Sequence, residues 1–318
     1  MEKIISIIDL NAQIQWVIAI ILSILVIATT TFLIWNKLRP SKLVDEMTLR
    51  TRSWWGMCFI FLFASTVHPI ITYIGLAFLS FFTLREVYTL LKLRDADRST
   101  LVACYLSIPI QYYFAYQGWY TMFLIFIPVF MFIIIPFLLV LSGDTDDIIR
   151  SMCILPTSLM LGVFGISHLA LLISFPAMNE GDLSGKALLL FLIFITEAND
   201  IMQFIFGKIF GRNKILPEVS PNKTWEGFIG GVISTTIIGY LMGFLIPSLA
   251  WWQLILISFC IAVLGFMGDS IISAVKRDFG VKDMGDSIPG HGGFLDRIDS
   301  LSTTSSPFFH LIYFMIIA

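Results

Sequence analysis

Charge is scarce in this sequence. Of its 318 residues only 13% are Asp, Glu, Lys or Arg, whereas 57% are hydrophobic and the mean hydropathy is +0.88. A soluble domain carries about a quarter charged residues, so the composition excludes an ordinary soluble domain and predicts a polytopic membrane protein. The net charge of −2 says little about partners, because in such a chain the positions of the charges matter more than their sum.

Cysteine is also scarce, and no internal repeat, low-complexity segment or long linker is present. The four cysteines, Cys58, Cys104, Cys153 and Cys260, lie within apolar runs and at no metal-ligand spacing. We interpret them as small core residues rather than as disulfides or zinc ligands. The whole chain, residues 1–318, is therefore expected to form one membrane domain.

Long apolar runs predict an all-α bundle of about nine or ten membrane segments. Residues 13–35 are nearly uncharged and long enough to cross a bilayer as a retained helix. The run Trp54–Leu84 is interrupted at His68-Pro69, which favours a bent hairpin of two short helices that returns to a basic loop at 85–98. Further helices are expected over 101–116, 120–141, 153–175, 187–206, 224–246, 251–275 and from 295 onward. The chain then divides into mainly N-terminal helices at 13–200, a catalytic region with two motifs at 199–299 and a last helix at 295–318.

The charge that is present gathers at residues 265–300, which hold ten of the chain's 42 charged residues. Asp269 ends an apolar run and lies two helical turns before Lys276, roughly 10 Å along a helix axis, so we expect it below the membrane surface. Asp296 and Asp299 lie one turn apart on one helix face. Because hard cations prefer carboxylate oxygens, two such helices joined by a Gly/Pro/His loop predict a divalent-cation pocket. A solvated loop that only obeys topology rules would explain the Lys and Arg but not an Asp inside an apolar helix.

A second cluster, residues 207–231, combines four basic residues with five glycines. Its run SPNKTWEG, from Ser220 to Gly227, is typical of a loop that enters a helix, whose free N–H groups can hold phosphate. The alternative is a helix cap with lysines that only set topology. Just before this cluster, Glu197 and Asp200 share one face of an apolar helix, and buried carboxylates in a membrane span usually serve function. Acidic groups for a metal and basic groups for phosphates indicate a phosphate-rich substrate.

Together the two clusters resemble the phosphatidate cytidylyltransferases, also called CDP-diacylglycerol synthases. The resemblance rests on Ser220-Pro-x-Lys-Thr-x-Glu-Gly227 and on the ungapped run Ser273-x-x-Lys276-Arg277, Lys282-Asp283, Gly285, Ile288-Pro289, His291-Gly-Gly293 and Asp296-Arg297-x-Asp299. It is tight from Asn199 to Asp299, and the N-terminal part shares only hydropathy. It implies transfer of a cytidylyl group from CTP to phosphatidate, with release of pyrophosphate and formation of CDP-diacylglycerol.

By position, the resemblance implies roles for individual residues. Asp269 and Asp296 would be catalytic metal ligands, with Asp299 beside them. Catalytic contacts to the phosphates or the nucleotide would come from Lys276, Arg277, Lys282, Asp283, His291 and Arg297. Substrate contacts would come from Asp200, Ser220, Lys223, Thr224 and Glu226. The implied cofactor is Mg²⁺, with a monovalent cation left open. The sequence departs from the family at Ile201-Met202-Gln203-Phe204, which leaves the lipid substrate less defined than the reaction.

Basic residues predict the orientation. The stretches 37–52, 85–98, 208–223 and 276–297 hold 17 of the 20 Lys and Arg, and the expected hairpins put all four on one side, which the positive-inside rule makes the cytoplasm. We therefore expect an inner or plasma membrane protein whose site faces the cytoplasm. The expected partners are CTP, phosphatidate or a related lipid phosphate, and membrane lipids; a homodimer is left open, and no nucleic acid is expected.

Other functions stay open at this point. A cytidylyltransferase for a different lipid phosphate would keep both motifs. A transporter would account for the buried carboxylates but not for the motifs, and a non-catalytic, lipid-binding paralogue would keep the fold. A CDP-alcohol phosphotransferase would need an Asp-Gly-x-x-Ala-Arg element followed by Gly-x-x-x-Asp-x-x-x-Asp, and the sequence has neither.

Overall fold

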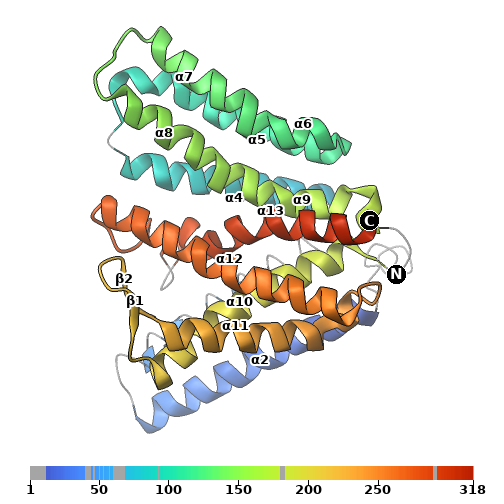
Figure 1. Ribbon diagram of the computed structural model, residues 1–318. Helices are drawn as coiled ribbons and strands as arrows, with labels where there is room; N and C mark the ends of the chain where they lie inside the picture. Colours follow the sequence, from blue (N-terminus) through green and yellow to red (C-terminus); the bar gives the residue numbers. More distant parts are fainter. Residues whose placement is uncertain are drawn as a thin grey trace, which may run out of the picture.

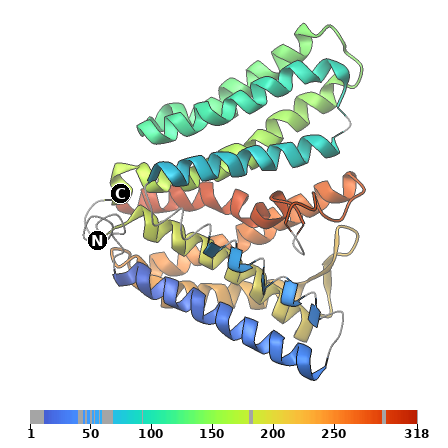
Figure 2. The ribbon, with the colours of Figure 1, turned by 180° about the vertical axis from the view of Figure 1, so that it is seen from behind.

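The computed structural model is a bundle of long helices that run back and forth between two ends (Figure 1). It describes residues 12–39, 44–45, 47–49, 51–52, 54–56, 58–59, 69–91, 93–179, 183–288 and 292–317. The start of the first described helix and the end of the last lie at one end of the bundle, and a short β-hairpin lies at the other, as the view from behind also shows (Figure 2).

The N-terminal part contains α2 (Ala12–Leu38), α4 (Pro69–Leu90), the 3₁₀ turn η1 (Asp95–Asp97) and α5 (Arg98–Gln117). Two long helices follow, each with a π-helical turn in its middle: α6 (Tyr120–Ile125), η2 (Phe126–Met131) and α7 (Phe132–Leu141), then α8 (Ile148–Leu159), η3 (Met160–Gly165) and α9 (Ile166–Ser174). The C-terminal part contains η4 (Pro176–Asn179), α10 (Gly185–Phe210), the strands β1 (Lys214–Leu216) and β2 (Ser220–Thr224), α11 (Trp225–Leu241), η5 (Met242–Leu245), α12 (Trp251–Asp278) and α13 (Leu295–Ile317).

Local sequence signals explain several helix ends. Pro69 is the first residue of α4, where its missing N–H is not needed. Gly118 ends α5 with a φ of 65°, a left-handed conformation that glycine adopts without strain. Thr224 begins α11 as an N-cap, because its hydroxyl accepts a hydrogen bond from a backbone N–H of the first turn.

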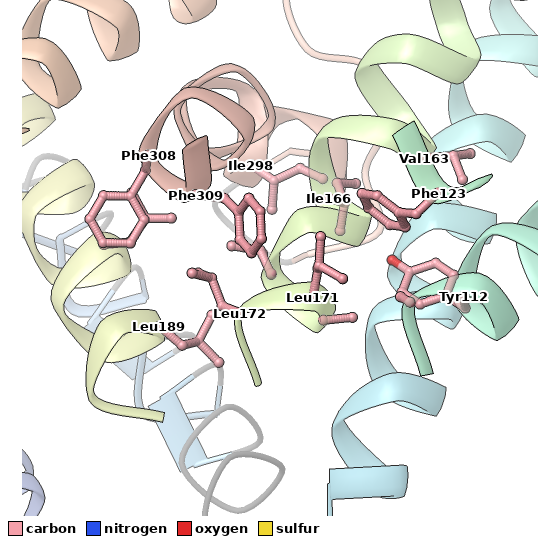
Figure 3. Close-up of a cluster of buried hydrophobic side chains, with 14 of the residues drawn as sticks. Tyr112, Phe123, Val163, Ile166, Leu171, Leu172, Leu189, Ile298, Phe308 and Phe309 are labelled. Carbon is pink, nitrogen blue, oxygen red and sulfur yellow. The ribbon is translucent and has the colours of Figure 1, made fainter. Parts of the chain in front are cut away.

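Helix α13 joins the two parts of the bundle. It packs against α9 and η3 on one side and against α10 and α12 on the other. Figure 3 shows this core, in which Phe308 and Phe309 of α13 lie near Leu171 and Leu172 of α9 and Leu189 of α10, all at most 1% exposed. A closely packed core of this kind resists displacement, so it holds the polar start of α13 in place as well.

Seven helices of the described chain are long and apolar enough to cross a membrane: Ile18–Leu38, Pro69–Leu90, Tyr120–Leu141, Ile148–Ser174, Gly185–Phe210, Trp225–Leu245 and Trp251–Asp278. Large hydrophobic side chains such as Phe132, Ile133 and Ile237 are exposed on the outside, where a bilayer would cover them. The protein is thus an integral membrane protein with a polytopic helical bundle. Helices α5 and α13 run alongside these seven (Figures 1 and 2), and the total of nine or ten membrane segments stays a prediction.

Helix α4 extends further than the sequence predicts. The expected loop beginning at Arg85 is wrong, because α4 continues to Leu90. In this last part of α4, Val87 belongs to the hydrophobic core and Glu86 is buried as well, each with 8% of its surface exposed. Most of the first helix of the expected hairpin, with His68, lies outside the described residues.

Candidate active site

A pocket of about 180 Å³ lies at the hairpin end of the bundle. It is formed by the second half of α10, strand β2, the start of α11 and the second half of α12. Its lining residues are Asp200, Gln203, Phe204, Ser220, Asn222, Lys223, Thr224, Gly227, Phe228, Phe266 and Asp269. The pocket therefore brings together five of the predicted site residues, from both sequence clusters and from the acidic helix before them: Asp200, Ser220, Lys223, Thr224 and Asp269.

Lys223 links the two clusters directly. Its Nζ lies 3.0 Å from Oδ2 of Asp269 and donates a hydrogen bond to Oγ of Ser270 at 2.7 Å. It also stands over the ring of Phe266, 4.6 Å from the centroid, in a cation–π geometry. The Lys223 side chain is only 12% exposed, and that of Asp269 is 33% exposed. Lys223 is therefore held against α12, unlike a solvated lysine that only sets topology.

The backbone of the second cluster differs from the predicted loop. Strands β1 and β2 pair in an antiparallel hairpin, with Lys214 opposite Thr224 and Leu216 opposite Ser220. The Oγ1 of Thr224 then accepts a hydrogen bond from the N–H of Gly227 at 3.1 Å. This N–H at the start of α11 is consequently already satisfied, and it is not free to hold phosphate as the sequence suggested.

Glu226 lies outside the pocket lining and holds the chain before β1. Its carboxylate accepts hydrogen bonds from the backbone N–H groups of Arg212 and Asn213 and from the side-chain amide of Asn213, at 3.1, 3.2 and 2.7 Å. These contacts tie the end of α10 to the first turn of α11. In this structure Glu226 shapes the hairpin, and its predicted substrate contact stays a prediction.

Four carboxyl groups gather beside the pocket: Glu197 and Asp200 of α10, Asp269 of α12 and Asp299 of α13. Each of the other three lies close enough to Asp200 to act on it electrostatically. The pocket lining itself contains Asp200 and Asp269 against one lysine, Lys223. The lining therefore combines acidic oxygens with one ammonium group.

The carboxylate of Asp296 lies outside the pocket lining and accepts hydrogen bonds from other parts of the protein. Its Oδ1 accepts a hydrogen bond from Nζ of Lys276 at 2.9 Å, its Oδ2 accepts two backbone N–H groups at 2.7 and 2.9 Å, and its side chain is 2% exposed. Among the residues that the structure describes, no group of three or more His, Cys, Asp and Glu could hold a metal ion. Asp269 and Asp299 lie close enough to interact electrostatically, whereas the oxygens of Asp296 accept hydrogen bonds within the protein, and the predicted metal site of Asp269, Asp296 and Asp299 stays a prediction.

Three further predicted residues lie around the pocket end but not in the lining. The Nε of Arg277 donates to the backbone carbonyl of Val219 at 3.0 Å, which ties the end of α12 to the turn of the hairpin. Lys282 and Asp283 are exposed on the connection that follows α12. Their side chains are accessible to a ligand from water, and their predicted contacts to phosphate or nucleotide stay predictions.

Arg297 lies among the acidic groups. It acts electrostatically on Glu197 and on Asp299, and its Nε is buried without a hydrogen-bond partner among the described residues. An unpaired buried donor of a guanidinium group is costly, so this nitrogen is available to a ligand or to a small rearrangement. His291 lies outside the described residues.

Two residues near the site were not predicted from the sequence, Gln203 and Glu86. Gln203 lines the pocket, and its Nε2 is buried without a hydrogen-bond partner among the described residues. Its position three residues after Asp200, hence on the same helix face, could have revealed it. Glu86 of α4 was missed as well, although a carboxylate within an apolar run is the signal that singled out Asp269. Its partners lie at the start of α13.

Comparison of the sequence with known proteins identifies a family and several relatives. The sequence model of the cytidylyltransferase family matches residues 48–316. The "uncharacterized protein YnbB" of Escherichia coli strain K12 is 38% identical over 297 residues, which are 93% of this chain and 97% of that protein. The phosphatidate cytidylyltransferase of Staphylococcus saprophyticus is 40% identical over 129 residues (40% of this chain, 50% of that protein), and that of Haemophilus influenzae is 38% identical over 138 residues (42% and 48%). The match to these two thus spans about half of their length.

Proposed function

The chain belongs to the cytidylyltransferase family, and from this premise we propose that it transfers the cytidylyl group of CTP to phosphatidate, which forms CDP-diacylglycerol and pyrophosphate. A phosphate oxygen of the lipid bonds to the α-phosphorus of CTP, while the bond from that phosphorus to the bridging oxygen of pyrophosphate breaks. A phosphate monoester has a second pKa of about 6, so it is mostly ionised near neutrality and needs no strong general base. The protein must mainly supply position and charge compensation.

The observation that carries the proposal is the pair of Lys223 and Asp269, which places a cation for phosphates and an acidic oxygen in one pocket. The lining of the same pocket also contains three aromatic side chains, Phe204, Phe228 and Phe266. Phe204 is 59% exposed on the outside of α10, in a helix long and apolar enough to span the bilayer. A lysine and aromatic side chains in one lining, with one aromatic exposed on a helix of membrane-spanning length, support a substrate with a phosphate head and a lipid tail.

Mg²⁺ is part of the proposal. Proteins usually hold Mg²⁺ through one or two carboxylates together with substrate phosphates and water, rather than in a cage of side chains. Asp200 and Asp269 of the pocket lining supply two carboxyl groups of this kind beside Lys223. Bound with the nucleotide, Mg²⁺ would neutralise phosphate charge during transfer. Removal of divalent ions with EDTA is expected to abolish turnover and added Mg²⁺ to restore it; a monovalent cation stays open.

A different lipid phosphate is the second candidate substrate. Gln203 and Phe204 belong to the stretch in which this sequence departs from the phosphatidate cytidylyltransferases, and both line the pocket. Residues that line a pocket select among substrates by shape and hydrogen bonding. The departure therefore bears on the lipid rather than on CTP or the transfer reaction.

We also propose that the hairpin end faces the cytoplasm from the inner or plasma membrane. Exposed basic residues of that end include Lys214, Arg277 and Lys282, and basic residues near membrane spans favour the cytoplasmic side. This orientation would let CTP reach the pocket from water while the lipid stays in the bilayer.

The test uses the purified full-length protein in detergent micelles with labelled CTP, Mg²⁺ and phosphatidate, and it measures CDP-lipid and pyrophosphate. A second arm replaces phosphatidate by an isoprenoid phosphate, and a third replaces CTP by ATP. Asp269→Asn removes the charge in the pocket. Asp278→Asn is the matched control, because Asp278 is an exposed carboxylate at the end of the same helix.

The wild type and Asp278→Asn are expected to form CDP-diacylglycerol and pyrophosphate in equal amounts, and Asp269→Asn is expected to form neither. Product from the isoprenoid phosphate alone would replace phosphatidate as the substrate. Bound CTP without product from any lipid phosphate would refute catalysis and favour a non-catalytic paralogue. Uptake of a solute into sealed vesicles without CTP turnover would favour a transporter.

A further inference from the structure

Glu86 of α4 holds the beginning of α13. Its Oε1 accepts hydrogen bonds from the backbone N–H of Phe294 at 2.9 Å and from Oγ of Ser287 at 2.8 Å, and its Oε2 accepts the backbone N–H of Leu295 at 3.1 Å. The N–H groups in the first turn of a helix have no partner within that helix. A carboxylate brought from another part of the chain therefore satisfies two of them here.

The segment that Glu86 holds is the α12–α13 connection, residues 279–294, of which 289–291 lie outside the described part. Helix α4 contacts it a second time, because the rings of Phe82 and Phe294 stack with centroids 4.9 Å apart. The space around the Glu86 carboxylate is tight: a Cβ on Gly293 would lie 2.5 Å from its Oε2. The connection is thus fitted closely around this one carboxylate.

Asp296 holds the same connection from the α13 side. Its Oδ2 accepts the backbone N–H groups of Met284 and Gly293, at 2.7 and 2.9 Å, and its Oδ1 binds Lys276 of α12. Two carboxylates therefore determine the course of the segment that carries much of the family resemblance. Asp296 belongs to that motif, whereas Glu86 comes from the N-terminal helices and from no motif.

We propose that Glu86 is a positioning residue for the transfer reaction, an inference that rests on the proposed function. The first turns of α13 carry Asp299, and the hydroxyl of Ser300 donates to Oδ1 of Asp200 in the pocket lining at 3.3 Å. A shift at Phe294 and Leu295 would therefore move the acidic groups beside the pocket. Glu86 lies outside the pocket lining, so it acts on the reaction through the connection and not through the substrates.

Glu86→Gln tests this with little change in shape. A glutamine side chain has one acceptor oxygen and an NH₂ group, so it cannot accept hydrogen bonds at both of the positions that Oε1 and Oε2 occupy now. The start of α13 should then shift or fluctuate. Misplacement of reacting groups by about 1 Å can reduce turnover by about 100-fold. We expect kcat to fall about 10- to 100-fold with KM for CTP within about threefold, and Glu86→Asp, which keeps both oxygens, to recover part of kcat.

Tyr88→Phe is the matched control. Tyr88 lies on the same helix, half a turn after Glu86, and its hydroxyl makes a buried 2.9 Å hydrogen bond with Ser158 of α8, away from the connection. Removing this hydroxyl should lower Tm to an extent similar to Glu86→Gln, since each removes buried hydrogen bonding. Its kcat should stay within about twofold of the wild type.

Amide hydrogen exchange gives a second readout that needs no turnover. In Glu86→Gln, peptides from residues 283–295 should exchange faster than in the wild type, and in Tyr88→Phe they should not. Unchanged kcat together with unchanged exchange in Glu86→Gln would overturn the inference. An equal loss of kcat in Glu86→Gln and in Tyr88→Phe at similar Tm would also overturn it, because the loss would then follow stability and Glu86 would be merely structural. A wild type that makes no CDP-lipid would refute the proposed function instead, and the exchange result would still decide whether Glu86 positions the connection.

Discussion

Lys223 and Asp269 form a contact whose energy can be worked out and measured. At the observed separation of 3.0 Å, Coulomb's law gives about 1.4 kcal/mol at the dielectric constant of water, about 80, and about 5.5 kcal/mol at an effective value of about 20. Because the Asp269 side chain is 33% exposed, solvent screens the pair, and we expect a coupling energy of about 2 kcal/mol.

The perturbation is Lys223→Met, which removes the ammonium group but keeps an unbranched apolar side chain over Phe266. It leaves Asp269 near Asp200 without its cation, so we expect Tm in detergent, measured by tryptophan fluorescence, to fall by roughly 4 °C. In the Asp269→Asn background the same substitution should lower Tm much less, because position 269 then has no negative charge that could lose its partner. Lys214→Met, at an exposed lysine of the same hairpin, is the control and should leave Tm nearly unchanged.

Activity gives the second half of this test. Lys223→Met should lower kcat/KM for CTP by about 30- to 1,000-fold, the range of a desolvated, charge-assisted contact worth about 2–4 kcal/mol. An equal loss of Tm in both backgrounds would show that the pair is not coupled. A normal kcat/KM for CTP would show that Lys223 only sets topology, and the reasoning about the pocket would then be refuted.

The other predictions concern the remaining carboxylates and the orientation. Asp269→Asn should abolish CDP-lipid formation and lower Tm no more than Lys223→Met does, whereas Asp296→Asn should lower Tm further, because it disturbs three buried hydrogen bonds; equal Tm values for the two Asp variants would contradict this distinction. A cysteine at Asn222, which is exposed, should react with a membrane-impermeant thiol reagent only from the cytoplasmic side, and labelling of intact cells from outside would reverse the orientation. Burial raises the pKa of the Asp97 carboxyl, but its hydrogen bonds with Arg94 outweigh burial and leave that pKa below 3.8. The stability this gives is present above pH 3.8 and is lost as pH falls through the lowered pKa, so Tm of the wild type should fall more steeply below pH 3.8 than that of Asp97→Asn; parallel curves would argue against it.

Several helices and both motifs were readable from the sequence alone. The runs that became α2, α10 and α12 are apolar over the length of a bilayer, and that property depends only on the residues within each run. The cap at Thr224 and the end of α5 at Gly118 likewise follow from local chemistry. The family resemblance rests on spacing within the chain, so it too needed no knowledge of the fold.

The grouping of the carboxylates could not be read in the same way. Asp269 and Asp296 look equivalent in the sequence, since each lies at the membrane end of an apolar helix. In the fold, Asp269 lines the pocket beside Lys223, whereas Asp296 is buried against Lys276 and two backbone N–H groups. Which oxygens stay available depends on the path of the chain between α12 and α13, and that path is determined by packing.

Composition, apolar length and motif spacing are properties of short stretches of chain, so the sequence alone shows that this is a membrane protein, where its charge gathers and which family it resembles. The β-hairpin before Thr224 and the reach of Glu86 to the start of α13 became visible in the folded chain. The N–H groups of Phe294 and Leu295 lie 208 and 209 residues from the carboxylate that satisfies them. No local pattern records such a pairing, because it arises from the way in which α4, α12 and α13 pack together.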